Sequence, residues 1–136
     1  ITLNKKIKIG QYYQEFDEEL LHLTLEQAVS HAYLEHGITI DDREVKKILS
    51  QYLFNPSSDG KLRLSSLSGG QKARFQLIRM LIGDPNLLIL DEPTNHLDLP
   101  SIEELENALL SYHGGLLYIS HDTNFINHMS GEVIKI

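Results

Sequence analysis

Two short, uninterrupted apolar runs constrain the fold of this chain more than any other feature of its sequence. They are Leu87–Leu90 and Leu116–Ile119, and each is bounded by residues that favour turns. Runs of this length between turn residues are typical of strands that are buried on both faces of a parallel sheet. Because a stretch with helical periodicity separates them, we expect a right-handed strand, helix, strand crossover and therefore an α/β fold with a parallel sheet.

The segments around these runs also carry helix and strand signals. Ser68 precedes a helix from about Gly70 to Ile82, and the helix between the two apolar runs should begin near Pro100. Polar and apolar residues alternate over Lys6–Ile9, which predicts a short strand, and Glu132–Ile136 predicts a final strand at the edge of the sheet. Helices and strands thus alternate through the second half of the chain.

The first half of the chain has mainly helical signals. Thr24 can cap a helix that ends at Gly37, and Asp41 with Glu44 forms the capping box of a second helix. The segment Asn55–Gly60 is dense in turn-forming residues and predicts a loop. We therefore expect a helical region followed by a segment that belongs to the sheet.

The composition limits the classes of function that this chain can have. Its 136 residues, 41% of them hydrophobic, suit one compact domain, and a net charge of −7 offers no broad cationic surface to nucleic acid. Cysteine is absent, which excludes disulfides and thiol chemistry. No apolar run approaches the roughly 18 residues of a membrane span, and the first residues do not resemble a signal peptide. The chain does not begin with Met, so we expect it to come from a longer protein.

Polar residues follow both apolar runs, at the points where the predicted strands end. Asp91 and Glu92 follow the first run, and Ser120, His121 and Asp122 follow the second. The carboxyl ends of parallel strands meet at one edge of the sheet, where ligands bind in folds of this type. One carboxylate there can hold Mg²⁺ and the other can activate a water for attack on phosphate. The alternative is that these are solvated turn residues.

A second feature is the sequence LSGGQ at Leu67–Gln71. A serine followed by two glycines at the start of a helix leaves backbone N–H groups accessible and directs the helix dipole outward, which suits an anion such as phosphate. The alternative reading of the same residues is a simple turn into a helix.

Three motifs, taken together, resemble the ATP-binding cassette (ABC) ATPases. In chain order they are LSGGQKAR at Leu67–Arg74, LLILDEPTNHLD at Leu87–Asp98 and YISHD at Tyr118–Asp122. The run EPTNHLD, Glu92–Asp98, is similar to the ABC-F subfamily, soluble proteins with two cassettes of which many act on the ribosome. The resemblance implies an α/β fragment of a P-loop-NTPase-like cassette, with a parallel sheet core, helices and a helical subdomain.

The resemblance also implies roles for individual residues. Glu92 would be the catalytic base, His121 the switch histidine that contacts the γ-phosphate, and Asp91 the Mg²⁺ ligand. Gln14, in KIGQYYQEF, is similar to the Q-loop glutamine, which contacts nucleotide and Mg²⁺; its alternative is a surface loop residue. The nucleotide-binding residues that the resemblance implies are Gln14, Ser68, Gly69, Gly70, Gln71 and Asp98.

One motif of the family is missing from this sequence. No G-x-x-x-x-G-K-[ST] phosphate loop occurs, and the nearest match, NPSSDGKL at Asn55–Leu62, lacks the first glycine and the final hydroxyl residue. The resemblance therefore implies that residues 1–136 are the carboxy-terminal part of one cassette. Residues from about 20 to 82 would form the helical signature subdomain, and residues 1–19 and 83–136 would belong to the α/β core. We expect this part alone to be inactive.

The expected function is part of a cassette that binds and hydrolyses ATP with Mg²⁺ in an ABC-F type protein, which acts on the ribosome in translation in the cytoplasm. A second cassette would be its partner, the ribosome would be contacted through other regions, and no membrane would be involved. Two alternatives stay open: the ATP-binding subunit of an ABC transporter, and an interaction module without catalysis. A DNA-associated role gains no support from the net charge of −7.

Overall fold

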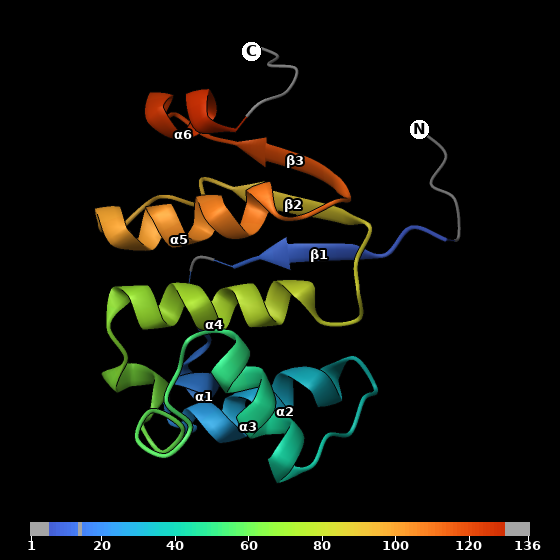
Figure 1. Ribbon diagram of the computed structural model, residues 1–136, viewed down its shortest axis with the longest axis vertical. Helices are drawn as coiled ribbons and strands as arrows, with labels where there is room; N and C mark the ends of the chain where they lie inside the picture. Colours follow the sequence, from blue (N-terminus) through green and yellow to red (C-terminus); the bar gives the residue numbers. More distant parts are fainter. Residues whose placement is uncertain (1–5, 14, 130–136) are drawn as a thin grey trace.

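The computed structural model describes residues 6–13 and 15–129 (Figure 1). The predicted strand at Glu132–Ile136 and the predicted Q-loop residue Gln14 lie outside the described residues. The elements, in chain order, are β1 (Ile9–Tyr12), α1 (Glu18–Leu21), α2 (Leu25–Glu35), α3 (Asp42–Gln51), the 3₁₀ helix η1 (Leu64–Ser66), α4 (Gly69–Leu81), β2 (Leu87–Asp91), α5 (Leu99–Leu110), β3 (Gly115–Ile119) and α6 (Thr123–His128).

The described strands form one parallel sheet in the order β1, β2, β3. Leu87 of β2 pairs with Ile9 of β1 on one side and with Gly115 of β3 on the other. The two apolar runs are therefore neighbouring parallel strands joined through α5, which confirms the α/β fold.

The first strand differs from its prediction. It was expected at Lys6–Ile9, but β1 begins at Ile9 and ends at Tyr12. The sequence pattern misses it because Gly10 lies against α4, where a Cβ on Gly10 would collide with the Met80 carbonyl oxygen. Only glycine fits this approach, so the strand has no regular apolar alternation to detect.

One face of the sheet packs against helices α4, α5 and α6. Tyr12, Leu88 and Leu90 point to this face and are buried together with apolar residues of the three helices. On the opposite face, Leu117 and Ile119 are 59% and 60% exposed. The prediction that β3 is buried on both faces is therefore wrong for the part of the chain that the structure describes.

The remaining helices surround a second core. It is formed by α1, α2, α3, η1 and the other side of α4, and Figure 1 shows α4 lying between α1–α3 and β1. The predicted caps are present: Thr24 and Gln27 form a capping box on α2, and Asp41 and Glu44 form one on α3. Gly37, with φ of 74°, follows the end of α2 as its sequence position predicts.

Both cores share α4, because its side chains alternate between them. Phe75 and Ile78 belong to the helical core, whereas Leu77 and Met80 belong to the sheet core. None of the helices in the described ranges is both long enough and apolar enough to cross a membrane.

The buried Tyr12 predicts how stability depends on pH in the alkaline range. Burial raises the pKa of Tyr12 from 10.0 to about 12. Above its ordinary pKa the unfolded chain releases this proton first, so the free energy of unfolding falls as pH rises, by at most about 1.4 kcal/mol per pH unit. Tyr12→Phe keeps the ring and removes the proton, so we expect a shallower decline.

Urea unfolding of the 136-residue chain and of Tyr12→Phe between about pH 9 and about pH 11 measures this difference. The other tyrosines titrate in both proteins and cancel in the comparison. Equal slopes in the two proteins would contradict the account of Tyr12.

Candidate functional site

The carboxyl ends of β2 and β3 bring two of the predicted site residues together. The backbone N–H of Glu92 donates a hydrogen bond to the Ile119 carbonyl oxygen at 2.8 Å, which extends the sheet by one residue. His121 then contacts the Glu92 carboxylate twice: its backbone N–H donates to Oε2 at 3.3 Å, and its Nε2 lies 3.2 Å from Oε1. The predicted convergence of Glu92 and His121 is thus present in the structure.

These two side chains differ in exposure. The Glu92 side chain is 18% exposed, whereas that of His121 is 94% exposed. A carboxylate that is mostly covered, beside an imidazole that projects into solvent, leaves room for a ligand on the imidazole side. The exposed imidazole is therefore accessible to a bound group.

Glu92 also has an uncommon backbone conformation. Its φ is 45°, in the left-handed region, which costs a residue other than glycine about 1–3 kcal/mol. The hydrogen bond to Ile119 holds one end of the strained segment, and a turn follows in which Asn95 N–H donates to the Glu92 carbonyl oxygen at 3.2 Å. Strain of this kind accumulates at functional sites, where it directs a side chain.

Asp91 occupies the last position of β2. It pairs with Ile119 in the sheet register and is exposed, so its carboxylate can be reached by a metal ion. No group of three or more His, Asp or Glu side chains that could hold a metal occurs within residues 6–13 and 15–129. Mg²⁺ is commonly bound through one or two carboxylates together with phosphate oxygens and waters, so Asp91 suits a metal that arrives with a nucleotide.

The signature residues form the start of α4. The Ser68 hydroxyl accepts a hydrogen bond from Gln71 N–H at 3.2 Å, and the Gln71 side chain accepts one from Ser68 N–H at 2.9 Å. Both polar side chains thus cap their own helix. At Gly69 a Cβ would meet nothing within 4 Å, so this backbone is open to an approaching group.

The signature motif and the strand ends lie at the same end of the molecule. In Figure 1 the first turn of α4 and the carboxyl ends of β1, β2 and β3 all lie on the left. The arrangement follows from the topology, because α4 runs antiparallel to the strands that it covers. One end of this chain therefore presents both sets of predicted site residues.

Asp98 has a local partner that the sequence analysis missed. It is the N-cap of α5, and its Oδ1 accepts hydrogen bonds from the Ser101 backbone N–H at 3.0 Å and from the Ser101 hydroxyl. The hydrogen bond from the Ser101 side chain is the main cause that lowers the pKa of Asp98, and the backbone bond acts in the same direction. The spacing D-x-x-S is an N-cap pattern, so a search for helix caps could have found this pair.

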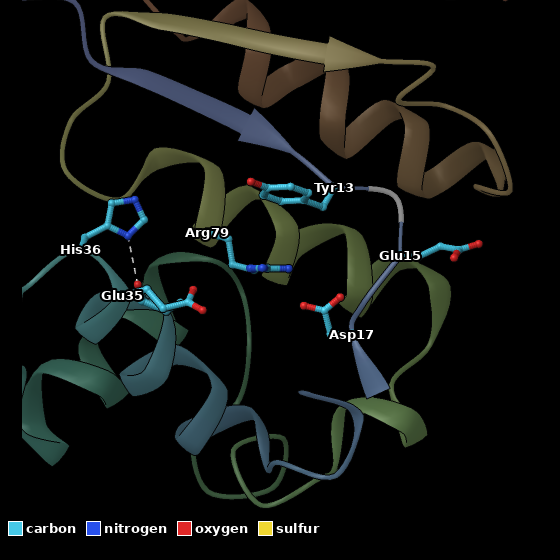
Figure 2. Close-up of a pocket in the computed structure, with 7 residues that line it drawn as sticks. Tyr13, Glu15, Asp17, Glu35, His36 and Arg79 are labelled. Atoms are coloured by element: carbon cyan, nitrogen blue, oxygen red, sulfur yellow. Dashed lines mark hydrogen bonds between the residues drawn. The ribbon is translucent and has the colours of Figure 1, made fainter. Parts of the chain in front are cut away.

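A hollow of about 290 Å³ lies between α2, α4 and the segment after β1 (Figure 2). Arg79 extends into it, with its guanidinium 5.1 Å from the centre of the Tyr13 ring. Glu15, Asp17 and Glu35 also line it. The sequence analysis did not find this hollow, because its lining comes from three separate segments.

Comparisons with known proteins place these features in a family context. The sequence model of the family described as "ABC transporter" matches residues 3–95. The putative ATP-binding protein YdiF of Bacillus subtilis is 40% identical over 137 residues, which cover 100% of this chain and 20% of that protein. The ABC transporter F family member 2 of Arabidopsis thaliana is 37% identical over 123 residues, 90% of this chain and 17% of that protein.

Solved structures show the same fold. A nucleotide-free ATP-binding cassette from an ABC transporter aligns with a TM-score of 0.70 at 18% identity, covering 88% of this chain and 53% of that one. A dimeric ATP-binding cassette in a post-hydrolysis state with ADP and Pi aligns with a TM-score of 0.68 at 23% identity, covering 90% and 56%. The chain spans about a fifth of the length of the curated relatives it matches.

Proposed function

Since the chain belongs to the ABC transporter family of ATP-binding cassettes, we propose that it supplies the hydrolytic edge and the signature motif of a cassette that hydrolyses ATP. The contact between Glu92 and His121 at the strand ends carries this proposal. Two groups with acid–base chemistry converge there, next to a carboxylate that suits Mg²⁺. The N-terminus of α4 provides accessible backbone N–H groups at the same end of the molecule.

The proposed reaction is attack of water on the γ-phosphate of ATP. The water oxygen bonds to the γ-phosphorus while the Glu92 carboxylate accepts a proton from that water. The bond between the γ-phosphorus and the β-phosphate oxygen breaks, which releases ADP and inorganic phosphate. His121 contributes a hydrogen bond to a γ-phosphate oxygen, because its exposed imidazole projects beyond the Glu92 carboxylate. Asp91 would hold Mg²⁺ in part, and the bound ion would supply positive charge next to the triphosphate.

The phosphates themselves need a further binding element. The sequence contains no G-x-x-x-x-G-K-[ST] loop, whose backbone N–H groups and lysine hold the phosphates in P-loop proteins. We therefore place this chain in a longer protein that provides the loop. In the cassette family the signature motif serves the nucleotide of the opposite cassette, so a second cassette is the proposed partner, and Ser68 and Gly70 would face it.

We also propose an ABC-F type role on the ribosome, in the cytoplasm. The run Glu92–Asp98 resembles that subfamily, and several relatives carry the name ABC transporter F family or ATP-binding cassette sub-family F. The net charge of −7 means that ribosomal RNA would be contacted by other regions of the protein. A transporter subunit is the alternative, and it would use the same chemistry at Glu92.

Sedimentation of the full-length protein separates these two roles. We expect the Glu92→Gln variant with Mg-ATP to sediment with ribosomes, because blocked hydrolysis prolongs the ATP-bound state, and we expect less sedimentation with ADP. Recovery of the protein with membranes instead, independent of nucleotide, would favour the transporter subunit.

The central test of the hydrolytic role is Glu92→Gln in the full-length protein. The amide keeps the shape of the side chain but cannot accept the proton, so we expect turnover to fall about 10²- to 10⁴-fold while ATP binding is kept. Glu103→Gln, the same change at an exposed position of α5, is the matched control and should leave turnover within about twofold.

Two outcomes would count against this assignment. Turnover of Glu92→Gln within about twofold of the unmutated protein would show that Glu92 is not the base, and would favour an interaction module. Calorimetric titration of Mg-ATP into the 136-residue chain alone should show no micromolar binding. Micromolar binding there would mean that another element replaces the phosphate loop.

A further inference from the structure

One small buried side chain lies where the first turn of α5, the helix that follows the hydrolytic edge, meets the first turn of α4. Ser101, in the first turn of α5, is 1% exposed. Its hydroxyl contacts Asp98 on its own helix, and it also faces Gly70 of α4, where a Cβ would stand only 3.3 Å from Ser101 Oγ. The Ser101 hydroxyl group therefore lies between Asp98 and the signature residue Gly70.

We propose that Ser101 is a positioning residue for ATP hydrolysis, which holds the segment between Glu92 and Asp98 at a fixed distance from the signature glycine Gly70. The inference rests on the proposed function, because it concerns the geometry of that same reaction. Ser101 touches neither the reacting atoms nor the Glu92 carboxylate, and it acts through Asp98.

The conformation of Glu92 depends on how both ends of the segment from Glu92 to Asp98 are held. At its start Glu92 is held in the left-handed region by the bond to Ile119. Along it, Leu97 N–H donates to the Thr94 carbonyl oxygen at 3.2 Å. At its end the Asp98 side chain caps α5, and Ile102 N–H donates to the Asp98 carbonyl oxygen at 3.0 Å. A strained residue keeps its conformation only while both ends of its segment are held, so loosening Asp98 would let Glu92 relax.

The two hydrogen bonds between Ser101 and Asp98 allow a positioning role of Ser101 to be distinguished from a role in helix stability. Asp98 Oδ1 accepts from both the backbone N–H and the hydroxyl of Ser101. Removal of the hydroxyl leaves the backbone bond, so α5 keeps its N-cap. What is lost is the second bond, which fixes the orientation of the carboxylate, and the hydroxyl group that lies beside Gly70.

A second link between the same two helices lies one turn farther on. Arg74 of α4 pairs with Glu104 of α5, with Nε 3.4 Å from Oε2. The Arg74 guanidinium also donates to the Leu53 carbonyl oxygen at 2.7 Å and lies 4.7 Å from the centre of the Phe54 ring. The two helices also share the apolar core of Leu77, Met80, Leu105 and Leu109. Ser101 therefore controls the local geometry at their first turns rather than the packing of the helices.

The test is Ser101→Ala in the full-length protein, with kcat and KM for ATP and the thermal unfolding midpoint as readouts. We expect kcat to fall about tenfold, since small displacements of a catalytic group are costly, while KM stays within about twofold. Ser111→Ala is the matched control: it removes a hydroxyl from the C-terminal end of α5, where Ser111 donates to the Asn107 carbonyl oxygen at 3.0 Å. It should change neither constant by more than about twofold.

Ser101→Cys keeps a side chain of similar shape but replaces a strong donor with a weak one. It should lower kcat in the same direction, and it replaces the alanine variant if that one does not fold. Two results for the Ser101 variants would overturn the role of Ser101. One is a kcat within about twofold of that of the unmutated protein, and the other is a KM that rises by the same factor as kcat falls. If the role of Ser101 is overturned but Glu92→Gln still abolishes turnover, the proposed function stands. If the unmutated protein does not hydrolyse ATP, both the proposed function and the role of Ser101 are overturned.

Discussion

The parallel register of β2 and β3 is the constraint on which the rest of the site depends. It places Asp91 beside Ile119 and lets Glu92 N–H reach the Ile119 carbonyl oxygen at 2.8 Å. With that bond formed, the chain beyond β3 brings His121 onto the Glu92 carboxylate. A shift of one residue would turn every side chain of the strand to the other face of the sheet and separate these groups.

The signature helix connects this edge to the rest of the chain. Helix α4 contributes Phe75 and Ile78 to the helical core and Leu77 and Met80 to the sheet core, so its position depends on both. Its first turn meets α5 at Ser101, and the Arg74 pair with Glu104 repeats the contact one turn later. A change in either core can thus reach the signature motif through α4 itself.

Much of this organisation could be predicted from local sequence signals. The apolar runs identified β2 and β3, and the capping residues Thr24, Asp41 and Ser68 marked three helix starts. What could not be predicted depends on contacts between distant segments. In β1, Gly10 lies so close to α4 that a Cβ would collide with the Met80 carbonyl oxygen. The left-handed conformation of Glu92 occurs where its backbone N–H bonds to β3.

A structure of the full-length Glu92→Gln protein with trapped Mg-ATP tests the central claim most directly. We predict a γ-phosphate within hydrogen-bond distance of His121, with Mg²⁺ beside Asp91, and a different nucleotide, held by the second cassette, at Ser68. A nucleotide bound away from the carboxyl ends of β2 and β3, or one molecule of ATP contacted by both His121 and Ser68 of the same chain, would contradict the account.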